Sequence, residues 1–234
     1  MISRIIKSTL NKNLLKSSFK SLTSNNLFKT NQMFFSSKDN LINCFSQELE
    51  YEEKEYKPIS DEEKKVFFQN SGFEYIESSN STRMQLKKTV DGFVVDIHYH
   101  ARSPMPEEES SENQEENVPS NMTDFFALIH KQGKNTGFLV DGCIMDSQLN
   151  INQVHVTGNL QEYHQKLITG NLEPDVYQGP DFGTLDENLR QSFFDFCNEL
   201  GINEECASFI EMTSLHKDQH LYMNWLKNAK QTLI

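Results

Sequence analysis

Cysteine is scarce in this chain of 234 residues, and its four copies lie far apart. No two of them have the C-x-x-C spacing that redox and zinc motifs use. A disulfide scaffold needs a denser set of cysteines, so the spacing argues against both a disulfide framework and a zinc site. We expect free, buried thiols in a reducing compartment. The cysteines are Cys44, Cys143, Cys197 and Cys206.

Long apolar runs are also missing. No stretch approaches the ~20 consecutive apolar residues of a membrane-spanning helix, so we expect no membrane span. The N-terminal region has no uninterrupted apolar stretch of roughly 7 to 15 residues, which makes a secretory signal peptide a poor interpretation. Glycine-rich phosphate loops and the G-x-S-x-G nucleophile motif are absent. We therefore expect no enzymatic activity and no cofactor.

Two histidine pairs have spacings that occur in metal sites. His98 and His100 fall on one face of a predicted strand, and His216 and His220 lie one helical turn apart. No carboxylate or cysteine completes a ligand set locally, and the second pair lacks the zinc-protease pattern. We interpret the first pair as a polar, solvent-facing row and the second as a charged, exposed helix face. A metal site or an enzyme that uses these histidines is the alternative.

Acidic residues are missing from residues 1–38, which carry seven bases. Apolar residues recur at i+4 in this segment, so they line one face of a helix. A basic, amphipathic, acid-free segment is typical of a mitochondrial presequence, with a disordered basic tail as the alternative. Its removal would change the formal charge from −12 to −19, because seven bases and no acid would be lost. The bases are Arg4, Lys7, Lys12, Lys16, Lys20, Lys29 and Lys38.

The remaining chain, 39–234, predicts a single α+β domain. The pattern of residues 39–64 predicts one exposed, charged helix that Pro58 ends or kinks. Its narrow apolar stripe needs a partner helix. Alternating apolar residues and turn signals such as Asp91-Gly92 and 133–135 predict an antiparallel meander. Its strands are expected at 73–78, 82–90, 93–99, 122–131, 136–145 and 150–157.

An acidic segment interrupts the predicted strands at residues 103–120. It holds three prolines and six glutamates and has no hydrophobic periodicity, so we expect a mobile loop. Two helices should follow the sheet. Thr184 and Glu187 form a predicted capping box for the first, Gly201 should end it, and Asn203 should begin the second.

With these elements in place, the chain resembles the mitochondrial acidic matrix protein family, also called the mitochondrial glycoprotein family. The resemblance is carried by Tyr177-Gln-Gly-Pro-Asp-Phe-Gly-Thr-Leu-Asp, Gly201-Ile-Asn and Tyr222-Met-Asn-Trp-Leu, and by the strand pair Asp91-Gly-Phe-Val-Val-Asp-Ile and Phe138-Leu-Val-Asp-Gly-Cys. It implies a highly twisted, seven-stranded antiparallel sheet flanked by one N-terminal and two C-terminal helices. It also implies a doughnut-shaped homotrimer. The seventh strand would lie within 158–177.

The resemblance further implies a non-enzymatic protein of the mitochondrial matrix. Such proteins bind cationic partners and are linked to mitochondrial translation, ribosome assembly and oxidative phosphorylation. An acidic surface repels nucleic acid, so the expected partners are basic proteins, such as ribosomal or RNA-binding proteins, and further copies of the chain. The alternative is a low-affinity calcium buffer, without the ligand spacing of an EF-hand. The candidate partner-binding residues are Glu48, Glu50, Glu52, Glu53, Glu107, Glu108, Glu109, Glu112, Glu115 and Glu116.

Overall fold

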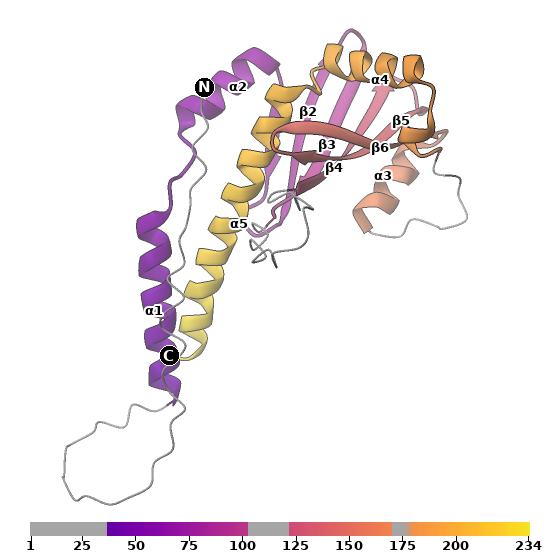
Figure 1. The fold of residues 1–234 in the computed structure, drawn as a ribbon. Helices are drawn as coiled ribbons and strands as arrows, with labels where there is room; N and C mark the ends of the chain where they lie inside the picture. The colour runs from indigo at the N-terminus through magenta and orange to yellow at the C-terminus, as the bar shows by residue number, and fades with distance from the viewer. Residues whose placement is uncertain (1–36, 103–121, 170–176, 178) are drawn as a thin grey trace, which may run out of the picture. The chain divides into compact units, whose positions relative to one another are not determined.

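A computed structural model describes residues 37–102, 122–169, 177 and 179–234. The expected α+β class is confirmed, with six strands in the described residues (Figure 1). Within those residues, no helix combines the length and apolar character that crossing a membrane requires. The elements are α1 (Ser37–Glu55), α2 (Asp61–Ser71), β1 (Glu74–Glu77), β2 (Arg83–Val90), β3 (Phe93–His100), β4 (Met122–Lys131), β5 (Gly137–Met145), β6 (Gln148–Thr157), α3 (Leu160–Thr169), the short 3-10 helix η2 (Phe182–Thr184), α4 (Glu187–Glu199) and α5 (Glu204–Thr232).

The six strands form one antiparallel meander in the order β1 to β6. Every strand that the sequence pattern predicts is present, with ends shifted by no more than two residues. At the β2–β3 turn, Asp91 and Gly92 have φ angles of 50° and 76°, the left-handed pair that a type I′ turn requires. The β5–β6 turn uses Asp146 and Ser147 in the same way without a glycine, so its sequence carries no strong turn signal.

The sheet has two faces with different coverings. Val95, Ile97 and Tyr99 of β3 face the main core, which also contains residues of α2, α4 and α5. The intervening residues of β3 face the opposite side, where α3 lies against a smaller cluster that includes Leu128 and Tyr163. Asn152 is the extra residue of a β-bulge in β6 and changes the alternation of side chains along that strand. The face to which a β6 side chain points therefore follows from its partner on β5, not from whether its residue number is odd or even.

The N-terminal part corrects the expectation of one helix over 39–64. The structure has two helices, because Pro58 follows the end of α1 and Ser60 begins α2. Ser60 and Glu63 form a capping box, which is the sequence signal for the start of a second helix. The prediction of a single N-terminal helix is therefore wrong, although the need of α1 for a partner helix is met by α5.

The C-terminal helices follow the prediction except at one cap. The N-cap of α4 is Asp186, not Thr184, which lies in η2, so the predicted capping box is wrong. Gly201 has a φ of 82° and the amides of Gly201 and Ile202 bond to Asn198 and Cys197, which completes a Schellman motif. Asn203 begins α5, as predicted.

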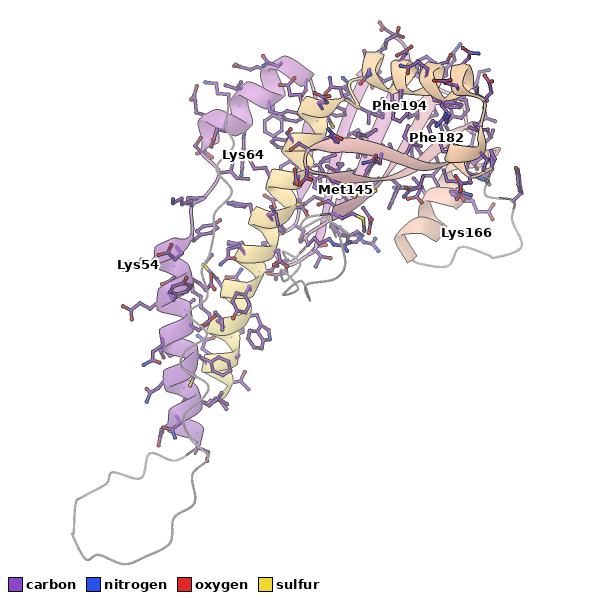
Figure 2. All side chains as sticks on the ribbon, viewed as in Figure 1. Lys54, Lys64, Met145, Lys166, Phe182 and Phe194 are labelled. Atoms are coloured by element: carbon purple, nitrogen blue, oxygen red, sulfur yellow. The ribbon has the colours of Figure 1, made fainter. Side chains whose placement is uncertain are left out.

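Aromatic contacts hold α4 and α5 to the core. Phe182 and Phe194, both labelled in Figure 2, meet edge to face with ring centroids 5.5 Å apart. Phe67 of α2 stacks on Phe209 of α5 at 3.9 Å. Leu189 of α4 and Trp225 of α5 lie outside this core and are 45% and 56% exposed.

The described residues do not include the expected seventh strand. The described part of 158–177 contains α3, and residues 170–176 lie outside the described residues, as does the acidic segment 103–120. Residues beyond this gap do run beside β6, because Gln153 bridges Asp181 and its side-chain amide donates to the carbonyl of Gly179.

Three of the four free cysteines are buried, as expected, and Cys44 on α1 is exposed. Burial raises the pKa of Cys197 to about 12. Cys206 has a pKa raised to about 12 by its burial as well, although nearby Lys88 opposes the change. These thiols therefore stay protonated and unreactive at neutral pH.

Replacement of Gly142 by alanine should destabilise the sheet. Gly142 lies at the bulge between β5 and β6, where an added Cβ would overlap the carbonyl oxygen of Asn150 and lie 2.8 Å from Cε1 of Phe125. We expect G142A to lower the free energy of unfolding by about 1–3 kcal/mol in equilibrium urea titrations. G158A is the matched control, because nothing lies within 4 Å of its added Cβ, and it should change stability by less than about 0.5 kcal/mol. Equal stability of the two variants would contradict this packing.

Replacement of His216 by glutamine should weaken the loss of stability in acid. The Tyr56 hydroxyl lies 2.5 Å from Nε2 of His216, and burial, reinforced by Lys64, lowers the pKa of this imidazole despite the opposing charge of Glu77. A lowered pKa means that the unfolded chain binds the proton more tightly, so stability falls as pH drops through the ordinary value of 6.5.

H216Q should therefore show a shallower decline in the free energy of unfolding from neutral pH to below 6.5 than the natural protein, measured by urea unfolding at each pH. The decline should not vanish, because His164 also has a pKa lowered chiefly by burial. Y56F is the control, since it removes the hydroxyl and keeps the imidazole. An identical pH profile for H216Q and the natural protein would show that His216 does not contribute.

Candidate functional site

The first candidate surface is the pair of helices α1 and α5. Figure 1 shows α1 alongside the C-terminal half of α5, and Phe45 meets Trp225 edge to face with ring centroids 5.9 Å apart. Tyr222 stacks on the same indole at 6.1 Å. The narrow apolar stripe of α1 therefore faces α5, which leaves the acids of α1 on its flanks and outer side.

The structure divides the four predicted glutamates of α1 into two groups. Glu48 accepts a hydrogen bond of 3.1 Å from Tyr222, and Glu53 forms a 2.9 Å ion pair with Lys227. Glu52 accepts a hydrogen bond from the side-chain amide of Gln219. These three glutamates help to hold α1 against α5, whereas Glu50 is exposed. Glu48 and Glu53 are also exposed, so their carboxylates still add to the negative surface.

The same helix pair presents apolar side chains to solvent. Leu41 and Tyr51 of α1 are 45% and 51% exposed, and Trp225 of α5 is 56% exposed. A charged helix pair with an uncovered aromatic ring has a surface suited to protein contact, since aromatic side chains are enriched at interfaces. The remaining predicted glutamates, Glu107, Glu108, Glu109, Glu112, Glu115 and Glu116, lie outside the described residues.

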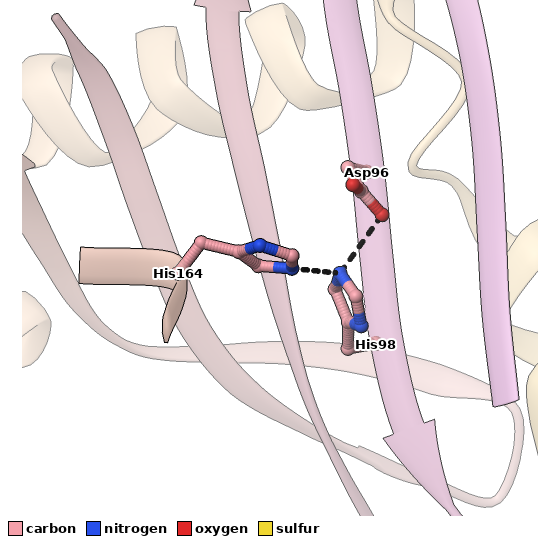
Figure 3. Close-up of side chains that lie close together, drawn as sticks. All are labelled: Asp96, His98 and His164. Atoms are coloured by element: carbon pink, nitrogen blue, oxygen red, sulfur yellow. Dashed lines mark hydrogen bonds and ion pairs between the residues drawn. The ribbon is translucent and has the colours of Figure 1, made fainter. Parts of the chain in front are cut away.

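The second candidate is a polar cluster on the sheet face that α3 covers. Figure 3 shows Asp96 and His98 of β3 with His164 of α3. Nε2 of His98 lies 2.9 Å from Oδ1 of Asp96 and 3.2 Å from Nε2 of His164. The side chains of His98 and Asp96 are only 12% and 13% exposed, so the prediction of a solvent-facing row is wrong for His98.

The period of β3 and the position of α3 assemble this cluster. Asp96 is two residues before His98, so both side chains point to the same face of the strand. The ring of His98 stacks on Phe126 of β4 with centroids 5.0 Å apart, which fixes its orientation. Leu160 and Tyr163 hold α3 on this face through contacts in the smaller apolar cluster.

Electrostatics favour a charged carboxylate and a neutral imidazole in the cluster. Burial tends to raise the pKa of Asp96, but hydrogen bonds from His98 and from Gln85, whose Nε2 lies 2.7 Å away, outweigh it and lower the pKa. Burial, followed by the charge of His98, lowers the pKa of His164. Lys87 also lowers both pKa values through its positive charge.

The other predicted histidines are not gathered here. His100 is exposed and lies 3.3 Å from the hydroxyl of Thr82. His216 packs against Tyr56, and His220 lies 3.3 Å from the amide nitrogen of Asn224. Both are half-buried, and Lys217 between them is buried, so the interpretation of an exposed helix face is wrong.

Sequence reasoning missed His164 and the carboxylate partner of His98. The expectation that no nearby carboxylate completes a ligand set is wrong, because Asp96 lies two residues before His98 on the same face of β3. A signal for α3 was present at Asn159, whose side chain accepts a hydrogen bond from the amide of Glu162 and donates one to its carboxylate. That helix start could have predicted α3, but not the strand that it covers.

Comparison with known proteins identifies the family to which this fold belongs. The model of the mitochondrial glycoprotein family, MAM33, matches residues 45–233. The mitochondrial acidic protein mam33 of Schizosaccharomyces pombe is 28% identical over 110 residues, which are 45% of this chain and 39% of that protein. An uncharacterized mitochondrial protein of Arabidopsis thaliana is 37% identical over 54 residues, 23% of this chain and 22% of that protein. These alignments thus span well under half the length of either relative.

Two solved structures share the fold at low sequence identity. A Leishmania major protein described as a sequence homologue of human p32 superposes with a TM-score of 0.65 at 17% identity, covering 85% of this chain and all of that chain. The p22 protein of Trypanosoma brucei gives 0.62 at 18% identity, covering 85% and 99%. The family model spans most of the chain and the fold agrees over nearly the same extent. The chain therefore belongs to the mitochondrial glycoprotein (MAM33) family.

Proposed function

We propose that this protein is a non-enzymatic scaffold of the mitochondrial matrix that holds basic client proteins by electrostatic contact. The observation that carries the proposal is the charge. The whole chain has a formal charge of −12, and loss of the basic segment 1–38 would make it −19. A charge of this size attracts cationic partners and speeds their encounter. The mitochondrial names of two relatives support the location.

The helix pair α1 and α5 supplies one part of the proposed binding surface. Glu48, Glu52 and Glu53 are positioned by contacts with α5, and Glu50 lies exposed beside them. Acids held on a packed helix lose little conformational entropy when a basic client binds. We propose that the glutamates of segment 103–120 supply the second part. The clients would be ribosomal and RNA-binding proteins, which connects the scaffold to translation, ribosome assembly and oxidative phosphorylation.

Replacement of Glu107, Glu108 and Glu109 by glutamine should weaken client binding. Three lost surface charges at about 0.3–0.5 kcal/mol each predict a decrease in affinity of about five- to tenfold. The measurement is capture of basic proteins from mitochondrial extract over a series of salt concentrations, with the affinity for one captured client then determined directly. Binding should fall as salt rises, because screening weakens contacts between exposed charges.

A matched control separates local charge from total charge. Glu74, Asp195 and Glu199 are exposed acids on β1 and α4, and their replacement by Gln, Asn and Gln removes the same three charges. This control should keep most of the affinity. Equal losses in the two triple variants would assign binding to net charge alone, and capture that is insensitive to salt would refute the electrostatic scaffold.

We also propose that the functional form is a homotrimer. Leu41, Tyr51 and Trp225 are exposed on the α1–α5 pair of one chain, and assembly would remove such apolar surface from water. Three copies would place three acidic surfaces in one particle and strengthen binding to a client with several basic segments, without a new type of contact.

The ratio of native to denatured mass should be three for the purified protein. This ratio of native to denatured mass is the same wherever a leader segment is removed. W225A should shift the population towards monomers, because Trp225 lies on the exposed face of the pair. L189S is the control, since Leu189 is 45% exposed on α4. A natural protein with a mass ratio of one would contradict the trimer, and a trimer in W225A would exclude this face from the interface.

The contacts of the α1 glutamates support the scaffold better than the alternative function, a low-affinity calcium buffer. Calcium takes 6–8 oxygen ligands in most protein sites. Three of the five α1 glutamates are already engaged with separate groups of α5, namely Tyr222, Gln219 and Lys227. Their carboxylates are therefore directed along the helix pair rather than towards one shared point, and the scaffold remains our proposal.

A further inference from the structure

One proton on Nε2 of His98 cannot make a well-directed hydrogen bond to Asp96 and to His164 at the same time. Nε2 of a histidine carries at most one proton. If Nε2 of His98 donates to Oδ1 of Asp96, that proton cannot also be directed at Nε2 of His164. If His164 donates instead, the lone pair of His98 faces the carboxylate. Two close contacts, at 2.9 and 3.2 Å, thus compete for one ring nitrogen.

A single cation would satisfy all three atoms at once. Zinc binds imidazole nitrogen at about 2.0–2.1 Å and carboxylate oxygen at about 2.0–2.2 Å, so two ligands in a tetrahedral arrangement are separated by about 3.3 Å. The ligand atoms of the cluster are separated by 2.9 Å and 3.2 Å for the two direct contacts, and all three lie within 4.8 Å of one another. Small rotations of the side chains would bring them to metal-binding distances.

The surroundings have the features of a supported site. Gln85 donates to the Asp96 carboxylate at 2.7 Å, the type of outer contact that orients metal ligands. Phe126 stacks on the His98 ring, and Leu128, Leu160 and Tyr163 form an apolar cluster near the site. Lys87 opposes binding through its charge, and it stands beside Asp96 as its cross-strand partner.

We propose that Asp96, His98 and His164 form a binding site for a divalent transition metal ion, with Zn²⁺ as its occupant. Two imidazoles and one carboxylate are a ligand set that suits zinc, whereas calcium and magnesium prefer oxygen ligands alone. Three protein ligands leave one coordination position for water or for a group from a partner. This site is independent of the proposed acidic surface for clients.

The metal would also link two elements that lie far apart in the sequence. Asp96 and His98 belong to β3, while His164 belongs to α3. Binding would hold α3 against the sheet, in addition to the apolar contacts of Leu160 and Tyr163. Metal occupancy would therefore control how often α3 leaves this sheet face, because a ligand stabilises the state that binds it.

The test uses the full chain without an affinity tag, freed of metal by a chelator. Calorimetric titration with Zn²⁺ should give one saturable site per chain, and elemental analysis should confirm the stoichiometry. D96N, H98Q and H164Q should each lower the affinity by more than about a hundredfold, and Q85L by about tenfold, since loss of an outer contact costs less than loss of a ligand. Far-UV circular dichroism would verify that each variant is folded.

H100Q is the matched control, because His100 lies on the same face of β3 and its contact is with Thr82 instead of the cluster. Its affinity should equal that of the natural protein. Hydrogen exchange supplies a second measurement: Zn²⁺ should slow exchange of the α3 amides in the natural protein and in H100Q, but not in H164Q. A merely structural role of His164 would not make exchange depend on zinc.

Two results would overturn the proposal. One is a dissociation constant above about 100 µM for Zn²⁺ in the natural protein, which is too weak for a built site. The other is tight binding that survives D96N, H98Q and H164Q, which would place the metal elsewhere, such as on the surface acids. Neither result would affect the proposed binding of basic clients, which is measured with salt and with different residues.

Discussion

Contact between α5 and one face of the sheet is the interaction on which the positions of α1, α2 and α4 depend. Phe209 and Ile210 of α5 lie in the same core as Val95 and Ile97 of β3. Burial of each such side chain contributes about 1.5–3 kcal/mol. Phe67 then stacks α2 on Phe209, and the Schellman motif at the end of α4 leads directly into α5. The C-terminal half of α5 provides the surface for α1.

On the opposite face of the sheet, α3 is held by polar as well as apolar contacts. Among the side chains that the structure describes, four buried residues form the apolar cluster around α3, and many more form the core beneath α5. Polar groups occupy part of this face, with Asp96 and His98 beside His164. Polar contacts therefore act on this face of the sheet together with the apolar cluster. The α1–α5 helix pair and the α3 cluster thus belong to different parts of the fold.

Local patterns predicted most of the elements because their causes are local. The alternation in β3, the Asp91-Gly92 turn, Gly201 and Asn203 each act through neighbouring residues, and the structure contains all four features. The errors arose where local signals competed. Pro58 and the Ser60 cap divided the helix expected over 39–64, and Asp186 rather than Thr184 began α4. Trp225 fits an apolar helical pattern, yet it is exposed, because a pattern does not say whether a partner covers it.

Charge distribution, strand order and family resemblance could be recognised in the chain alone, since each is a property of composition or of short-range spacing. The position of His164 beside His98 could not, because 66 residues separate them and only the packing of α3 on the sheet brings them together. The same holds for Glu48, Glu52 and Glu53, which read as free surface acids until α5 supplies their partners. Side chains that meet across a fold acquire their chemistry from that contact, and contacts between distant segments are decided by tertiary packing.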